Sequence, residues 1–68
     1  MIKVEIGNRI RKIRNQQGIS QEKLALKADI DRTYLASVEA GKRNISIVNL
    51  EKILNALDVS FCDFFQGM

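Results

Sequence analysis

The sequence of 68 residues lacks histidine, proline and tryptophan, and its only cysteine is Cys62. One cysteine without any histidine excludes an intrachain disulfide and a structural zinc site. We expect Cys62 to be a small buried hydrophobic residue in a reducing cytosol. The sequence also lacks a glycine-rich phosphate loop and a nucleophile beside a base. It therefore predicts neither an enzyme nor a bound cofactor.

Long apolar segments are absent too. No segment approaches the roughly 18 apolar residues of a membrane span, and Lys3 and Glu5 interrupt the first apolar positions, unlike a signal peptide. We therefore expect a cytoplasmic protein without membrane contact. Its apolar content of 46% suffices for one small core, so the whole chain, residues 1–68, is predicted to form one domain.

Positive charge is concentrated in the first part of the chain. Residues 1–43 carry ten Lys or Arg against five Asp or Glu, whereas residues 44–68 carry one against three. This distribution favours a surface for a polyanion in the first part. The alternative is solubilising charge that happens to be uneven.

Apolar residues recur with a helical period throughout, and no segment predicts a strand. The first helix has one apolar stripe, and Gly18 is placed to end it. That stripe consists of Ile2, Ile6, Ile10 and Ile13.

Four residues of the type that caps helix N-termini precede the later helices, namely Ser20, Asp31, Ser46 and Ser60. The second helix is predicted over about 21–28 and the third over about 32–40. The sequence therefore predicts an all-α fold, a five-helix bundle.

Residues 21–40 predict two short helices around a tight turn, a helix-turn-helix. At about 100° per residue, one face of the second of these helices is apolar and must be buried. The other face begins with Arg32 and Thr33 and continues with Ala36 and Ser37. Arg32 has the donors for a bidentate contact with guanine. Thr33 can form a hydrogen bond with a base or contact a thymine methyl group. The alternative is a merely solvated face.

Polar residues flank this helix at positions that commonly bind phosphates, namely Ser20, Gln21, Arg43 and Asn44. For Arg43 the alternative is that it reaches into a groove of the DNA. Tyr34 has two open interpretations. Its ring packs at the edge of the core and its hydroxyl reaches a phosphate, or the ring only packs.

Arg14 and Glu39 are placed near the ends of the first and third helices. We predict a structural ion pair between them, on the rim of the protein rather than on the base-reading face.

The last eight residues contain three phenylalanines, Phe61, Phe64 and Phe65. A helix this short leaves part of them exposed, so we expect at least one, Phe61 or Phe65 foremost, to anchor a homodimer with help from the fourth helix. The alternative is that all three cover the core of the monomer. A homodimer is also expected because one module makes too few base contacts to define a unique DNA site.

Three segments carry a resemblance to a known family, namely GISQEKLA (18–25), DRTYLASVEAGKRNIS (31–46) and NLEKILNALDV (49–59). The chain resembles the phage-repressor type of helix-turn-helix protein, and within it the controller proteins of restriction-modification systems. The resemblance implies a homodimer that binds a pseudo-palindromic double-stranded DNA operator and regulates transcription, including that of its own gene. It also implies Arg32, Thr33, Ala36 and Ser37 as base readers.

The alternatives within this fold are a phage-type repressor and an antitoxin that binds a toxin and regulates its own gene. Activation of transcription would add RNA polymerase as a partner, with Glu22, Glu51 and Asp58 as acidic candidates for that contact. One position departs from the family pattern, because Asp29 stands where the turn usually has glycine. Since aspartate tolerates a left-handed backbone better than most residues, we expect an intact but slightly strained turn.

Overall fold

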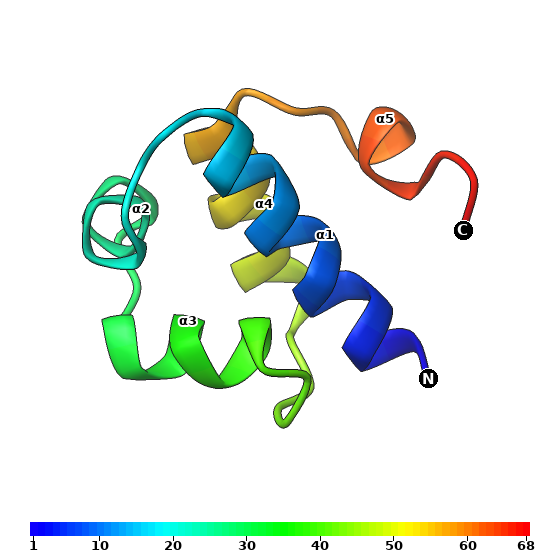
Figure 1. Ribbon diagram of the computed structural model, residues 1–68, viewed down its shortest axis with the longest axis horizontal. Helices are drawn as coiled ribbons and strands as arrows, with labels where there is room; N and C mark the ends of the chain where they lie inside the picture. Colours follow the sequence, from blue (N-terminus) through cyan, green and yellow to red (C-terminus); the bar gives the residue numbers. More distant parts are fainter.

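The computed structural model describes residues 1–68, which form five α-helices and no strand (Figure 1). The predicted all-α, five-helix fold is confirmed. The helices are α1 (Ile2–Gln16), α2 (Gln21–Ala28), α3 (Arg32–Glu39), α4 (Ile47–Leu57) and α5 (Phe61–Phe65).

The helix caps lie where the sequence predicted them. The side chains of Ser20, Asp31, Ser46 and Ser60 each accept a hydrogen bond from a backbone N–H two or three residues later, at 3.0–3.1 Å. Each bond satisfies one donor that the first turn of a helix leaves free. These local bonds fix where α2 to α5 begin.

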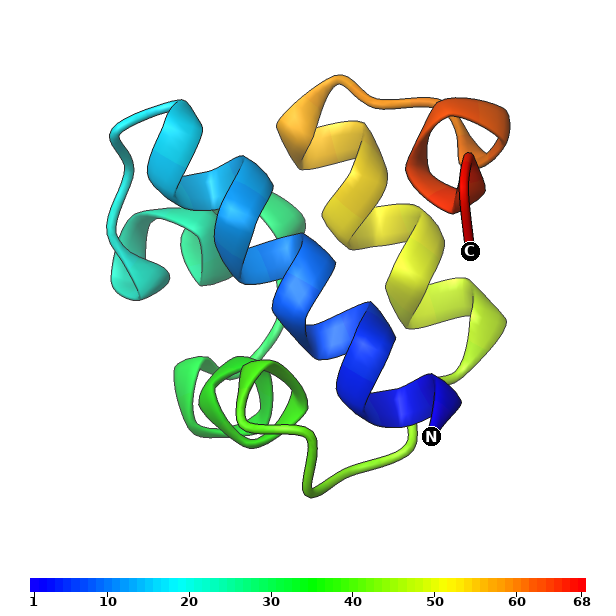
Figure 2. The same ribbon diagram turned by 45° about the vertical axis from the view of Figure 1, so that its right-hand side comes forward.

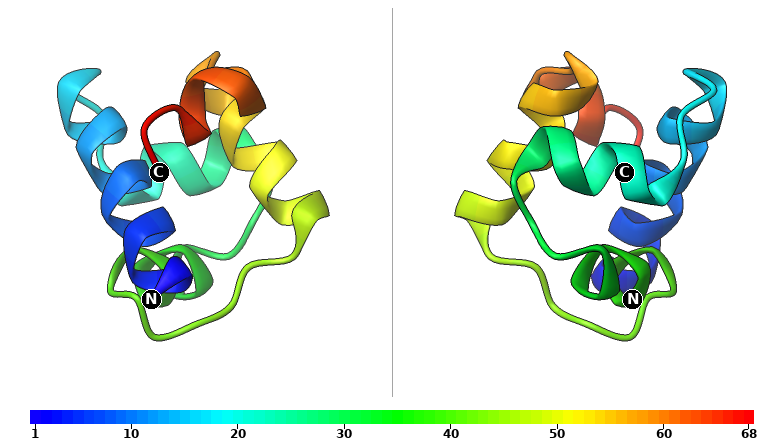
Figure 3. Two further views of the ribbon diagram at one scale, coloured as in Figure 1. Left: turned by 90° about the vertical axis from the view of Figure 1, so that its right-hand side faces the viewer. Right: turned by 90° about the vertical axis from the view of Figure 1, so that its left-hand side faces the viewer.

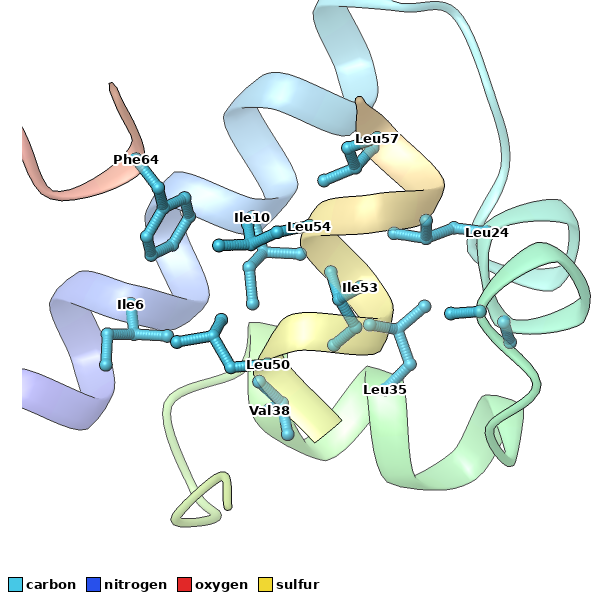
Figure 4. Close-up of a cluster of buried hydrophobic side chains, with 12 residues drawn as sticks. Ile6, Ile10, Leu24, Leu35, Val38, Leu50, Ile53, Leu54, Leu57 and Phe64 are labelled. Carbon is cyan, nitrogen blue, oxygen red and sulfur yellow. The ribbon is translucent and has the colours of Figure 1, made fainter. Parts of the chain in front are cut away.

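The core lies between α1 and α4, and α2, α3 and α5 close it on the remaining sides (Figure 2). Figure 4 shows Ile6 and Ile10 of α1 facing the apolar side of α4, with Phe64 entering from α5. The buried apolar residues are Ile6, Ile10, Leu24, Ala25, Ala28, Leu35, Val38, Leu50, Ile53, Leu54, Leu57 and Phe64.

Within the predicted stripe of α1, Ile2 at the start of the helix is 59% exposed. One expectation about the core was wrong, because Cys62 is exposed and not buried. The five-residue helix α5 turns only Phe64 fully into the core, and Cys62 lies on another side of it.

Close contact between α1 and α3 depends on Gly7. A Cβ atom at this position would lie 2.1 Å from the backbone carbonyl oxygen of Val38 and 3.1 Å from that of Glu39. Only glycine therefore allows the two backbones to approach this closely. This approach places the C-terminal end of α3 directly against α1.

The turn between α2 and α3 has the strained position that the sequence predicted. Asp29 adopts a left-handed backbone, with φ of 57° and ψ of 48°, and its side chain makes no hydrogen bond within the protein. The turn is otherwise well closed, because the N–H of Ile30 donates to the carbonyl of Ala25 at 3.0 Å. Asp58 ends α4 in the same conformation, with φ of 59°.

Replacing Asp29 with glycine is expected to raise the free energy of unfolding by about 1 kcal/mol. Glycine has no Cβ penalty at positive φ, and the change removes a negative charge from a helix C-terminus. Urea denaturation of the Asp29→Gly variant measures the effect. Asp29→Asn separates the two causes, because it removes the charge and keeps a side chain at this position. A clear loss of stability in Asp29→Gly would show that the Asp29 carboxylate makes a stabilising contact.

Candidate nucleic-acid interface

The outer face of α3 is free of other elements. In Figures 1 and 3, α3 lies at the lower edge of the molecule, and the segment that leads to α4 passes beside it. Arg32 and Thr33 are exposed at the start of this helix, and Ala36 and Ser37 are half-buried in its middle. The opposite face packs Leu35 and Val38, both at most 1% exposed, into the core.

This arrangement gives α3 a rigid base and an accessible polar face. The long arginine side chain stands at the N-terminal end, whereas the middle of the face has only small side chains. A second surface can therefore approach the helix closely along its length. In Figure 1, α2 is seen end-on while α3 runs across the view, so the two helices are crossed as in a helix-turn-helix.

The flanking residues have different surroundings. Ser20 is exposed, and its hydroxyl oxygen is occupied by the cap of α2. Gln21 is half-buried, and its side-chain amide donates to Glu39 Oε1 at 3.1 Å. The backbone N–H groups of Gln21 and Glu22 have no acceptor within the protein, so they point outward as donors at the positive end of α2. Arg43 and Asn44 are exposed in the segment after α3.

Tyr34 lies between these groups and the core. Its ring is half-buried and packs against the buried cluster, and the guanidinium carbon of Arg43 lies 5.0 Å from the ring centroid. Its hydroxyl accepts a hydrogen bond from Asn49 Nδ2 at 3.2 Å. The ring therefore packs, as both interpretations of the sequence required. Asn49 was not foreseen, because a sequence does not show which residue of α4 comes beside α3.

Arg14 and Glu39 form the predicted ion pair, and they do so in the interior. Arg14 Nε donates to Glu39 Oε2 at 2.8 Å, and Arg14 Nη2 donates to Glu39 Oε1 at 2.9 Å. The two side chains are only 11% and 2% exposed, so their placement on the rim was wrong. The pair is buried because Gly7 lets α1 approach the end of α3 so closely.

Further bonds extend this pair into a network. Arg14 Nη1 donates to the carbonyl oxygen of Ile19 at 2.9 Å, and Gln21 donates to Glu39 from the start of α2. The hydrogen bond to Glu39 raises the pKa of Arg14, more than burial lowers it. The guanidinium is thus held charged, and it joins α1, the start of α2 and the end of α3.

The three phenylalanines of α5 do not share one environment. Phe64 is 1% exposed and belongs to the core. The expectation that it contacts a second chain was therefore wrong. Phe61 and Phe65 are half-buried, and their rings stack with centroids 6.5 Å apart. Part of their apolar surface therefore remains exposed.

The start of α4 adds an apolar surface whose residues sequence reasoning did not name, although it expected the fourth helix to take part in the contact between copies. Ile47 and Val48 are 67% and 59% exposed. The sequence contained a signal for this surface. Two β-branched apolar residues directly follow the Ser46 cap, and they come before the apolar stripe that begins at Leu50. Their position outside that stripe indicates that the core does not use them.

Comparison with known proteins identifies the family. A profile of helix-turn-helix proteins matches residues 10–64. The chain belongs to the helix-turn-helix family. Among its relatives is the control protein C.MunI of a Mycoplasma species, which is 46% identical over 68 residues that cover 98% of this chain and 92% of that protein.

Solved structures of helix-turn-helix proteins agree with this assignment. The restriction-modification controller protein C.AhdI from Aeromonas hydrophila is 43% identical, with a TM-score of 0.89 over 93% of this chain and 96% of that one. The controller protein C.Esp1396I, solved as a tetramer with its natural 35-base-pair operator, is 40% identical, with a TM-score of 0.91 over 96% and 86% of the two chains.

These relatives confirm the predicted resemblance to restriction-modification controller proteins and the predicted class of function, a DNA-binding transcriptional regulator. They do not favour the alternatives of a phage-type repressor or an antitoxin. The relatives are regulators and not enzymes. None of the five helices combines the length and the apolar character needed to cross a membrane.

Proposed function

We propose that the chain regulates transcription by placing α3 in the major groove of an operator, with Arg32 and Thr33 reading base edges. The observation that carries this proposal is the outer face of α3, where both side chains are exposed at the start of a helix whose other face is buried. Arginine offers two parallel donors to the O6 and N7 atoms of guanine, and threonine offers a hydroxyl and a methyl group. The small side chains of Ala36 and Ser37 let the helix approach the bases.

The flanking polar residues hold the DNA backbone in this proposal. Ser20 and Gln21 lie where two free backbone N–H groups and the positive end of α2 favour a phosphate. Tyr34, Arg43 and Asn44 supply a hydroxyl, a guanidinium and an amide from the other side of α3. Contacts of this kind fix the register of α3 and do not select a sequence.

Two copies of the chain form the reading unit in this proposal. Each correct bidentate contact discriminates by about 1–3 kcal/mol, so one α3 does not define a unique site. A two-fold axis doubles the contacts and requires a pseudo-palindromic operator. The similar protein C.Esp1396I assembles as a tetramer on its operator.

We further propose that the present chain acts in the cytoplasm. Its exposed acidic residues Glu22, Glu51 and Asp58 contact RNA polymerase in this proposal.

The salt dependence of binding tests this function. A labelled fragment from upstream of the gene, titrated with protein in a fluorescence anisotropy assay, should lose at least about tenfold in affinity between about 50 and 200 mM salt. Phosphate contacts release counterions, which causes this loss. The absence of binding, or an affinity that salt does not change, would contradict the proposal.

The start of α4, together with Phe61 and Phe65, is the proposed contact between copies. We expect the double variant Ile47→Asp/Val48→Asp to be monomeric at micromolar concentration, because carboxylates on both sides of a two-fold axis repel and resist burial. Sedimentation velocity measures the change. Leu26→Asp is the matched control, because Leu26 is 81% exposed on α2, and this variant should remain dimeric. If the double variant also remains dimeric, the copies meet elsewhere.

A further inference from the structure

The structure assigns to Asn49 a positioning role in DNA binding: we propose that it holds the Tyr34 hydroxyl so that its hydrogen is directed at a phosphate. This inference rests on the proposed function, in which Tyr34 contacts the DNA backbone. Asn49 lies on α4 and not in the helix-turn-helix. It was not among the residues that the sequence singled out.

The hydrogen bond between the two side chains fixes the direction of the hydroxyl. Asn49 Nδ2 donates to Tyr34 Oη at 3.2 Å, so one lone pair of the oxygen is occupied. The bond from Asn49 is the only hydrogen bond that the hydroxyl makes within the protein. The hydroxyl hydrogen therefore remains available to an external acceptor. Accepting a hydrogen bond also polarises the hydroxyl and makes it a stronger donor.

Arg43 completes the cluster at the face of the ring. Its guanidinium carbon is 5.0 Å from the ring centroid, which is within the range of a cation–π contact. Arg43 and Tyr34 are exposed and half-buried, respectively. The ring thus presents a cation on its face and a donor at its tip. Both groups suit the same ligand chemistry, an anionic oxygen such as that of a DNA phosphate.

The placement of Asn49 is itself fixed. Its backbone N–H donates to the Ser46 hydroxyl oxygen at 3.1 Å, as the third residue of the first turn of α4. Its side chain is half-buried between α4 and α3. The start of α4 therefore determines where the tip of Tyr34 lies relative to α3.

The test is a double-mutant cycle on DNA affinity. Tyr34→Phe keeps the ring beneath Arg43 and removes the hydroxyl from both copies on the operator, so we expect a loss of at least about tenfold, as for hydrogen bonds to a charged group. Asn49→Ala should lower the affinity by about threefold to tenfold. The combined variant should bind no more weakly than Tyr34→Phe alone, because Asn49 acts only through the hydroxyl. The base preference should not change in any of the three variants.

Two controls separate positioning from a structural role. Asn55→Ala removes an exposed asparagine from the other half of α4 and should leave the affinity unchanged. Tyr34 is the only tyrosine and the chain has no tryptophan, so near-ultraviolet circular dichroism reports on this ring. That signal should change in Asn49→Ala and not in Asn55→Ala, while the melting temperatures of both variants stay close to that of the wild type.

Three outcomes would overturn the inference. If Tyr34→Phe weakens binding and Asn49→Ala does not, the positioning role is wrong and the phosphate contact of Tyr34 stands. If the two losses multiply in the combined variant, Asn49 contacts DNA itself. If neither variant weakens binding, the contact of Tyr34 with phosphate fails along with the inference, whereas salt-dependent binding of the wild type would still support DNA recognition by α3.

Discussion

Replacing Glu39 with alanine is expected to lower the free energy of unfolding by about 3–5 kcal/mol, because the change leaves a buried guanidinium without its partner. Three donors lose their acceptor at once, namely Nε and Nη2 of Arg14 and the amide of Gln21. Small domains have total stabilities of about 5–15 kcal/mol, so the loss is a large fraction of the whole. Thermal denaturation at one fixed protein concentration should show a melting temperature lower by about 15 °C or more.

Two further variants identify the cause. Arg14→Met/Glu39→Met replaces the pair by apolar groups and should recover most of the stability, because no unpaired charge remains. Glu51→Ala removes an exposed glutamate from α4 and should change the stability by no more than about 0.5 kcal/mol. A double variant as unstable as Glu39→Ala would mean that packing at the end of α3, and not the unpaired charge, accounts for the loss.

The network around Glu39 also has a consequence for recognition. It joins the start of α2, where Gln21 is proposed to hold a phosphate, to the end of α3, which is proposed to read bases. The relative position of the two contacts on DNA is therefore fixed by a buried bond. A folded variant with an altered network should bind DNA more weakly even though Glu39 itself faces the interior.

Replacing Arg32 with alanine is expected to reduce specific DNA affinity by a factor of at least about 30. Each copy loses one bidentate contact of about 1–3 kcal/mol, and two copies act together on the operator. Arg32 is exposed at the first position of α3, so the stability of the protein should change by no more than about 0.5 kcal/mol. Anisotropy titrations of a specific and a scrambled DNA fragment measure the two affinities separately.

The matched control is Arg32→Lys, which keeps the positive charge and loses the planar fork of donors. It should retain most of the affinity for scrambled DNA and lose much of the preference for the specific fragment. Equal losses on both fragments for Arg32→Ala would make Arg32 a phosphate contact, and the base-reading role would then be wrong.

Local features of the chain were predictable because their causes are local. The α2 boundaries follow from the Ser20 cap and from the turn at Asp29, and both are visible within a few residues of the helix. The buried face of α3 follows from the spacing of Leu35 and Val38. The left-handed conformation of Asp29 was instead expected from the resemblance, because the family usually has glycine at this position of the turn.

Features that depend on depth or on neighbouring elements were not predictable. The pairing of Arg14 with Glu39 followed from helix ends, but its burial depends on the contact that Gly7 permits between α1 and α3. Cys62 was expected to be buried because a free cysteine commonly is, but which side of the short helix α5 faces the core depends on the packed structure. The hydrogen bond between Asn49 and Tyr34 could be found only in the packed structure, since the two residues are fifteen positions apart along the chain.

The most direct test of the account is selection of bound sequences from a random DNA pool with the wild-type protein. The proposed reading by two copies of α3 predicts an inverted repeat with half-site centres about 34 Å, or one DNA turn, apart and a conserved guanine in each half-site. Enrichment of one unpaired site, or of no sequence at all, would contradict the claim that two copies of α3 read the operator about a two-fold axis.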